Sequence, residues 1–67
     1  MTVDALRRTL KTHRLAHGMS YETLARDLHA QTGYSISLHG LRKFILGQTN
    51  PNATTQYALE TYLRKAA

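Results

Sequence analysis

The sequence contains no cysteine and no tryptophan, and its 67 residues include one proline and one phenylalanine. Without cysteine, the chain can form neither a disulfide framework nor a zinc site with thiolate ligands. A domain of this size is close to the lower limit at which one hydrophobic core holds a fold without such cross-links. We therefore expect a single small domain that is stabilised by apolar packing and lacks room for a sizeable catalytic cleft.

Acidic residues are also scarce. Four Asp and Glu stand against nine Lys and Arg, which gives a formal net charge of +5 and a pI near 10.1. No acid occurs between Leu28 and Leu59, whereas Arg42 and Lys43 lie in the middle of that stretch. Such an excess of positive charge favours a polyanionic partner. The other interpretation is a basic, solvated surface without a function.

Long apolar runs are missing as well. The longest is Phe44, Ile45 and Leu46, far short of the roughly 20 residues that a membrane span needs. The N-terminal region also lacks the apolar centre of a signal peptide. These absences predict a soluble, cytoplasmic protein without membrane association.

No group of residues has the pattern of a catalytic or metal site. General acid–base chemistry needs paired carboxylates or a histidine in a pocket, and four scattered acids do not offer them. His13 and His17 have a spacing that can ligate zinc, but no Cys, Asp or Glu is placed to complete the site. We interpret both histidines as solvent-exposed. The expectation is a protein that is not an enzyme and binds no metal, cofactor or small-molecule ligand.

Glycines, the proline and capping residues divide the chain into four segments with helical periodicity. Helices are predicted from residue 3 to about 17, from a Ser20 cap to about 32, from a Ser37 cap to Gly47, and from Asn52 or Thr54 onward. Their apolar positions at helical spacing are Val3, Leu6, Leu10, Leu24, Ala25, Leu28, Leu41, Phe44, Ile45, Ala58, Leu59, Tyr62 and Leu63. The outer faces of the first helix carry Arg7, Arg8, Lys11 and Arg14. No run alternates with period two, and residues 34–37 cannot build a sheet alone, so the fold class is an all-α, compact four- to five-helix bundle.

The second and third segments resemble the helix-turn-helix of the phage-repressor and Cro-like DNA-binding family. The resemblance rests on ISLHGLRKFILGQTNP, residues 36–51, and on LARDL, residues 24–28. Around Leu41, the family's apolar, cap, apolar, glycine and proline positions are held by Ile36, Ser37, Phe44, Gly47 and Pro51. This resemblance implies one lambda-repressor-like domain over residues 1–67, with the helix-turn-helix motif at about residues 20–47. More weakly, TTQYALETYL, residues 54–63, is similar to the tail of small phage regulators associated with anti-CRISPR operons.

One feature departs from the family pattern. There, a glycine follows the small alanine about one helical turn later, whereas Gly33 follows Ala25 after eight residues. An inserted turn adds about 6 Å to the helix or to its turn. The approach angle of the third helix therefore stays open.

The resemblance also implies which side chains read DNA. A helix in the major groove turns its N-terminal side chains toward base edges while its other face stays on the core. Arg42 and Lys43 suit guanine O6 and N7. His39 can share a hydrogen bond with a base or a phosphate, and Leu38 can contact a thymine methyl. Gly40 lies on the same side, where it permits either close backbone approach or a tight crossing with the preceding helix.

Phosphate contacts are expected on both sides of the third helix. At the start of the second, free N–H groups and hydroxyls can bind an anion, although Tyr21 can instead pack against the first helix. The loop after the third helix supplies more contacts in this family, although its residues also suit ordinary turn chemistry. The expected phosphate-binding residues are Ser20, Tyr21, Ser37, Gln48, Thr49, Asn50 and Asn52.

The resemblance implies a transcriptional regulator that binds double-stranded DNA in a sequence-specific way. It would act as a repressor by occluding a promoter, and it would be associated with the nucleoid of a bacterial or phage-infected cell. One short helix offers few base contacts, each discriminating by about 1–3 kcal/mol. A homodimer on an inverted repeat, with third helices about 34 Å apart, would supply the remaining specificity. The fourth segment has more apolar surface than a small core needs, and its expected interface residues are Tyr57, Leu59, Tyr62 and Leu63.

Two other functions remain open. The chain can be a basic protein-binding adaptor or antirepressor that reuses the helix-turn-helix scaffold. Alternatively, LRRTLKTHRL, residues 6–15, can present a cationic face to anionic lipid or to an acidic partner. Against the lipid, its apolar stripe is narrow and has no Trp or Phe to insert. Four scattered tyrosines form no obvious stacking surface for RNA.

Overall fold

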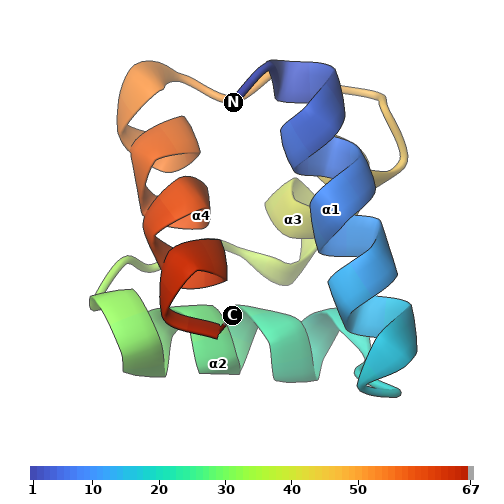
Figure 1. Cartoon of the computed structure of the whole chain (residues 1–67), viewed down its shortest axis with the longest axis vertical. Helices are drawn as coiled ribbons and strands as arrows, with labels where there is room; N and C mark the ends of the chain where they lie inside the picture. The colour runs from blue at the N-terminus through green and yellow to red at the C-terminus, as the bar shows by residue number, and fades with distance from the viewer. Residues whose placement is uncertain (67) are drawn as a thin grey trace.

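Four helices and no strand make up residues 1–66, the part of the chain that this computed structural model describes (Figure 1). The helices are α1 (Val3–Ala16), α2 (Tyr21–Thr32), α3 (Leu38–Ile45) and α4 (Ala53–Ala66). The predicted all-α fold is confirmed, with four helices. None of these helices has the length and apolar character that a bilayer crossing requires; the longest have 14 residues.

Each helix begins after a polar capping side chain. The side-chain oxygens of Thr2, Ser20, Ser37 and Asn52 each accept a hydrogen bond from the backbone N–H three residues later, at 2.8–3.1 Å. Such a bond satisfies one of the donors that a helix start leaves free. Gly33 ends α2 in the left-handed conformation, with φ of 75°, which glycine adopts without steric strain. These local signals explain why the predicted boundaries hold to within two residues.

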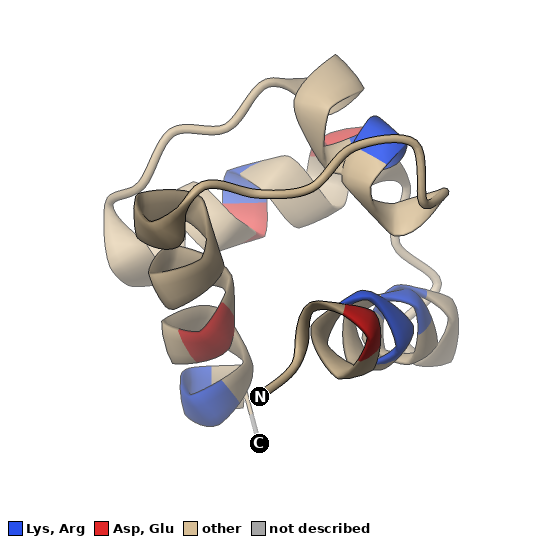
Figure 2. Ribbon diagram, turned by 90° about the horizontal axis from the view of Figure 1, so that it is seen from above, with Lys and Arg blue, Asp and Glu red and all other residues tan. Residues whose placement is uncertain are grey.

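The helices pack around one core. α1 and α4 stand side by side, and α2 crosses the same end of both (Figure 1). α3 lies on the far side, where it packs against α1 and α2 (Figure 2). This arrangement leaves α3 with one face on the core and the other toward solvent.

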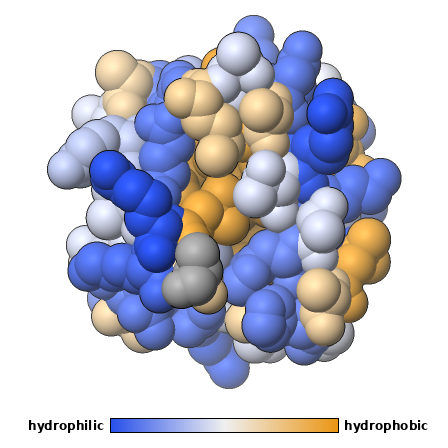
Figure 3. All heavy atoms as spheres, viewed as in Figure 1, coloured by the Kyte–Doolittle hydropathy of each residue, from blue (hydrophilic) through white to orange (hydrophobic). Residues whose placement is uncertain are grey.

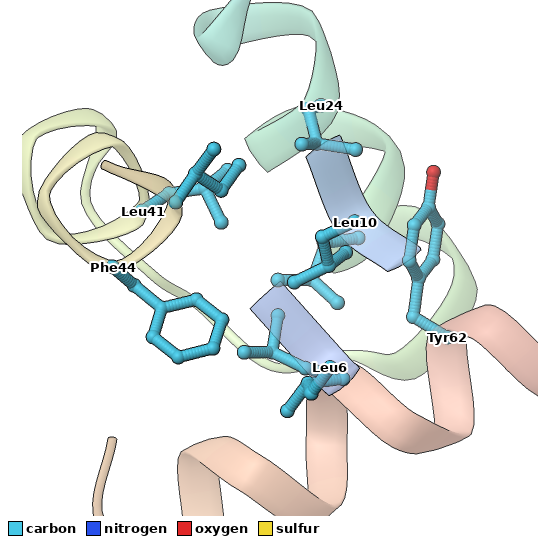
Figure 4. Packing of buried hydrophobic residues seen from close by; sticks show 9 residues of the cluster. Leu6, Leu10, Leu24, Leu41, Phe44 and Tyr62 are labelled. Atoms are coloured by element: carbon cyan, nitrogen blue, oxygen red, sulfur yellow. The ribbon is translucent and has the colours of Figure 1, made fainter. Parts of the chain in front are cut away.

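The core is built almost entirely from leucines and two aromatic rings (Figure 4). Its fully buried or nearly buried members are Leu6, Leu10, Leu24, Leu28, Leu41, Phe44, Ile45, Ala58, Leu59 and Tyr62. All stand at the predicted apolar positions of their helices, whereas Val3, Ala25 and Leu63, at other such positions, are only partly buried. α3 contributes three of these residues although it is only eight residues long, so its position is fixed mainly by packing.

The burial of Leu59 and Tyr62 corrects the predicted dimer interface. Both side chains have no exposed area, so neither is available to a partner. The prediction overestimated the apolar surplus of α4, because the small core uses these residues to contact α1 and α2. Of the predicted interface, Tyr57 is 67% exposed and Leu63 partly exposed.

Phe44→Ala tests the packing of α3. Phe44 is only 2% exposed, so removal of its ring should lower the free energy of unfolding by about 3–5 kcal/mol. Urea denaturation measures this change. Leu46→Ala is the matched control, since that side chain two positions away is 50% exposed and its loss should change stability by less than about 0.5 kcal/mol. Equal effects would mean that Phe44 does not anchor α3.

Candidate functional site

The outer face of α3 brings together the four residues predicted to read bases. Leu38, His39, Arg42 and Lys43 are all exposed, because Leu41, Phe44 and Ile45 occupy the opposite face and hold it on the core. Within residues 1–66, neither Arg42 nor Lys43 forms an ion pair or a side-chain hydrogen bond. Both cations therefore remain available to a ligand.

The charges around α3 are not neutralised by nearby acids. Asp4 pairs with Arg7 on α1, and Glu22 pairs with Arg26 on α2. Asp27 accepts a hydrogen bond from Tyr62, and Glu60 lies on α4. Figure 2 accordingly shows α3 with basic but no acidic residues. Glu22 lines a hollow together with Leu38, but its charge is offset by the ion pair with Arg26, so the charges of α3 itself, Arg42 and Lys43, attract an anion.

Gly40 adjoins the cap of its own helix and does not mark a crossing with α2. A Cβ atom there would lie 3.0 Å from Ser37 Oγ and 3.7 Å from Ile36 Cγ1, with no atom of α2 within 4 Å. The Gly40 N–H donates to the same Ser37 oxygen at 2.9 Å. The absent side chain thus leaves room for the serine cap, and the tight-crossing interpretation is wrong.

A feature that the sequence did not reveal is the role of Arg7, which joins α1 to the end of α3. Its Nε donates to the Phe44 carbonyl at 2.7 Å, and a terminal nitrogen donates to the Thr49 carbonyl at 3.1 Å. The other terminal nitrogen donates to Asp4 at 2.9 Å. The guanidinium also lies 5.0 Å from the centre of the Phe44 ring. A cation beside the C-terminal carbonyls of a helix is favourably placed.

Arg7 therefore fixes the loop that follows α3. Gln48, Thr49 and Asn50 are exposed in this loop, and the Gln48 N–H also donates to the Lys43 carbonyl at 2.8 Å. The predicted loop contacts are thus held beside α3 by main-chain bonds. Arg7 looked like one of several outward cations, since no sequence pattern identifies a carbonyl acceptor 37 residues away.

The residues predicted to bind phosphate at the helix starts differ in whether a side-chain N–H or O–H is free to donate a hydrogen bond. Ser37 accepts a bond at its oxygen but keeps its hydroxyl hydrogen, and Asn52 caps α4 with its oxygen but keeps its amide N–H groups. The Ser20 hydroxyl, by contrast, donates to Thr23 at 3.0 Å. Ser37 and Asn52 are therefore better placed to donate to an anion than Ser20.

Tyr21 packs against the first helix, as the alternative interpretation expects. Its ring is half-buried and lies 4.3 Å from the Arg14 guanidinium. Arg14 also donates to the Met19 carbonyl at 3.0 Å. This cation–π contact stabilises the connection between α1 and α2, and it gives Tyr21 a structural role whether or not its hydroxyl meets a phosphate.

A polar cluster of Asp27, His13 and Tyr62 joins α2, α1 and α4. The Tyr62 hydroxyl donates to Asp27 Oδ2 at 2.5 Å, and His13 Nε2 lies 2.9 Å from the same hydroxyl. Since the hydroxyl hydrogen goes to Asp27, His13 is assigned as the donor to the Tyr62 oxygen. Burial, followed by the bond to Asp27, raises the pKa of Tyr62 well above its usual range. The tyrosine therefore stays protonated and acts as a structural link.

His13 differs from the prediction that both histidines are solvent-exposed. It is half-buried, and its ring lies 4.4 Å from that of His17, which is exposed. Burial lowers the pKa of His13 and neighbouring His17 lowers it further, against an opposing effect of Asp27. Among residues 1–66, no three His, Asp or Glu side chains are grouped so that they can hold a metal ion.

Comparison with known proteins gives no relative for this site. No protein-family model matches the chain, and no match is found among curated proteins or among solved structures. The roles considered for these residues therefore depend on their own geometry and chemistry.

Arg7→Met tests the link between α1 and the loop. Losing hydrogen bonds from a charged donor to two carbonyls should lower the free energy of unfolding by about 1.5–3 kcal/mol and speed hydrogen exchange at the Gln48 amide. Arg8→Met, at an exposed neighbouring position, should change stability by less than about 0.5 kcal/mol. If the two variants behave alike, Arg7 does not hold the loop.

The His13 pKa predicts acid sensitivity. Because the folded-state pKa lies below the ordinary 6.5, the unfolded chain binds more protons once the pH falls through that value, and folding stability decreases. The unfolding midpoint in urea should therefore fall between about pH 7.5 and pH 5.5. His13→Gln should reduce this fall, while His29→Gln, at an exposed position on α2, should retain it. An unchanged fall in His13→Gln would assign the effect to other groups.

Proposed function

We propose that this chain is a sequence-specific double-stranded DNA-binding regulator that inserts the outer face of α3 into the major groove. The observation that carries this proposal is the division of α3 into two faces: three apolar residues are buried in the core, and Leu38, His39, Arg42 and Lys43 are exposed on the other side. An α-helix fits the major groove, where arginine or lysine can bind guanine O6 and N7. The absence of an acid on α3 favours approach to DNA.

In this proposal α2 and α3 act as a helix-turn-helix. α2 continues to Thr32 before Gly33 ends it, so the extra turn noted in the sequence lies within α2. The connection to α3 is then residues 34–37, which form neither helix nor strand and end at the Ser37 cap. The longer α2 moves the connection outward, while the packing of α3 on the core is retained. This is compatible with groove insertion at an angle specific to this chain.

Phosphates would be bound on either side of α3. The Ser37 hydroxyl and the helix start can donate to one phosphate. Gln48, Thr49 and Asn50 can donate from the loop that Arg7 holds, and the Asn52 amide lies just beyond it. Such contacts set the register of the helix on DNA but carry little sequence information.

Two copies on an inverted repeat would give the specificity that a single eight-residue helix lacks. Because Leu59 and Tyr62 are buried, we propose that the copies pair on DNA through a smaller contact than the four residues predicted on α4. Occupancy of a promoter by this pair is the simplest route to repression.

Selection of binding sites from randomised duplex DNA tests the reading by α3. The unchanged protein should enrich an inverted repeat, and Arg42→Ala should lose preference at defined positions of each half-site, by about 1–3 kcal/mol per contact. Lys11→Ala, at an exposed position on α1, should retain the full motif. Uniform weakening by Arg42→Ala on all sequences would make it a phosphate contact, and failure of the unchanged protein to enrich any motif would contradict the proposed function.

A further inference from the structure

A groove with an apolar centre separates α1 from α4, on the side of the molecule away from α3 (Figures 1 and 3). It consists of two hollows, of about 540 and 430 Å³, that share Thr9 and Leu63. Leu63 supplies the apolar surface from α4, and α1 offers the small side chains Thr9, Thr12 and Ala16. The larger α1 side chains Arg8, His13 and His17 line the second hollow beside these small ones.

The edges of this groove are positively charged. Arg8 borders one hollow and Arg64 the other. Arg64 donates a hydrogen bond only to Thr61 within the described chain, and Arg8 forms no ion pair with residues 1–66. Glu60 is the single acid that lines the groove. An occupant thus needs apolar side chains at its centre and negative charge at its margins.

A second copy of this chain does not meet that requirement. Asp4, Glu22 and Asp27 are each held by a side chain of their own molecule, Arg7, Arg26 and Tyr62 respectively. A copy placed in the groove would bring mainly further cations against Arg8 and Arg64, and like charges in contact are destabilising. A membrane surface is also unsuitable, because it cannot enter a concave groove between two helices.

We propose that the α1–α4 groove binds an acidic amphipathic helix of another protein. Apolar side chains one turn apart on that helix would cover Leu63, and its flanking carboxylates would pair with Arg8 and Arg64. Binding of this kind uses the i, i+3 and i+4 anchors typical of a helix lying in a groove. Since α3 lies on the far side of the bundle, the partner helix and DNA can be bound together, and the partner site does not depend on the proposed DNA-binding function.

The test is a selection from a displayed library of random 16-residue peptides against the full chain, followed by fluorescence anisotropy with the enriched peptide. Enriched peptides should carry Leu, Ile or Phe at helical spacing with Asp or Glu beside them. Arg64→Glu and Arg8→Glu should each weaken binding at least tenfold. Thr9→Gln, which places a longer neutral side chain in the groove at an exposed helical position, should also weaken it without a change in folding. Lys43→Glu is the matched charge reversal on α3 and should leave peptide binding unchanged.

Three outcomes would overturn the proposal. One is the absence of any enriched peptide, and another is an enriched peptide whose affinity is unchanged by the three groove variants. The third is self-association in analytical ultracentrifugation that Thr9→Gln abolishes, because the groove would then hold a second copy. Loss of DNA binding in Lys43→Glu with retained peptide binding would separate this site from the DNA-binding face.

Discussion

The burial of Leu41, Phe44 and Ile45 determines the rest of this structure, because an eight-residue helix has little stability of its own in water. α3 is helical where it packs on α1 and α2, and the same packing turns its remaining side chains outward. Arg7 reinforces this position from α1 by binding the last turn of α3 and the following loop. Core packing and one charged side chain thus decide which residues α3 exposes.

Helix positions and most of the core could be predicted from the sequence because their determinants are local. Ser20, Ser37 and Asn52 cap helices within three residues of themselves, and leucine spacing marks the buried faces. The roles of Arg7, Tyr62 and His13 could not be predicted, since their partners lie 35 or more residues away in the sequence. Leu59 and Tyr62 show the same limit: periodicity identifies an apolar face but does not tell whether a core or a partner covers it. The four exposed residues of α3 were predicted to lie together, and their geometry agrees, whereas their ligand stays a prediction.

Electrostatics gives the molecule two distinct basic regions. The first is the outer face of α3, where Arg42 and Lys43 are exposed together with Leu38 and His39. The second is the α1–α4 groove, where Arg8 and Arg64 border an apolar centre. Other cations have structural tasks: Arg14 binds Met19 and Tyr21, and Lys65 donates to the Gln31 carbonyl at 2.8 Å. The net charge of +5 is therefore less informative than the positions of the cations without partners.

NMR tests most directly whether α3 is the DNA-binding face. The chemical shifts of the backbone amides in the ¹⁵N-labelled protein are followed as duplex DNA is added. If α3 is the DNA-binding face, the largest shifts occur from Leu38 to Lys43 and from Gln48 to Asn50, and Thr9 and Leu63 in the α1–α4 groove stay unchanged. Shifts concentrated on α1 or in that groove, with α3 unaffected, would contradict the claim that α3 is the DNA-binding face.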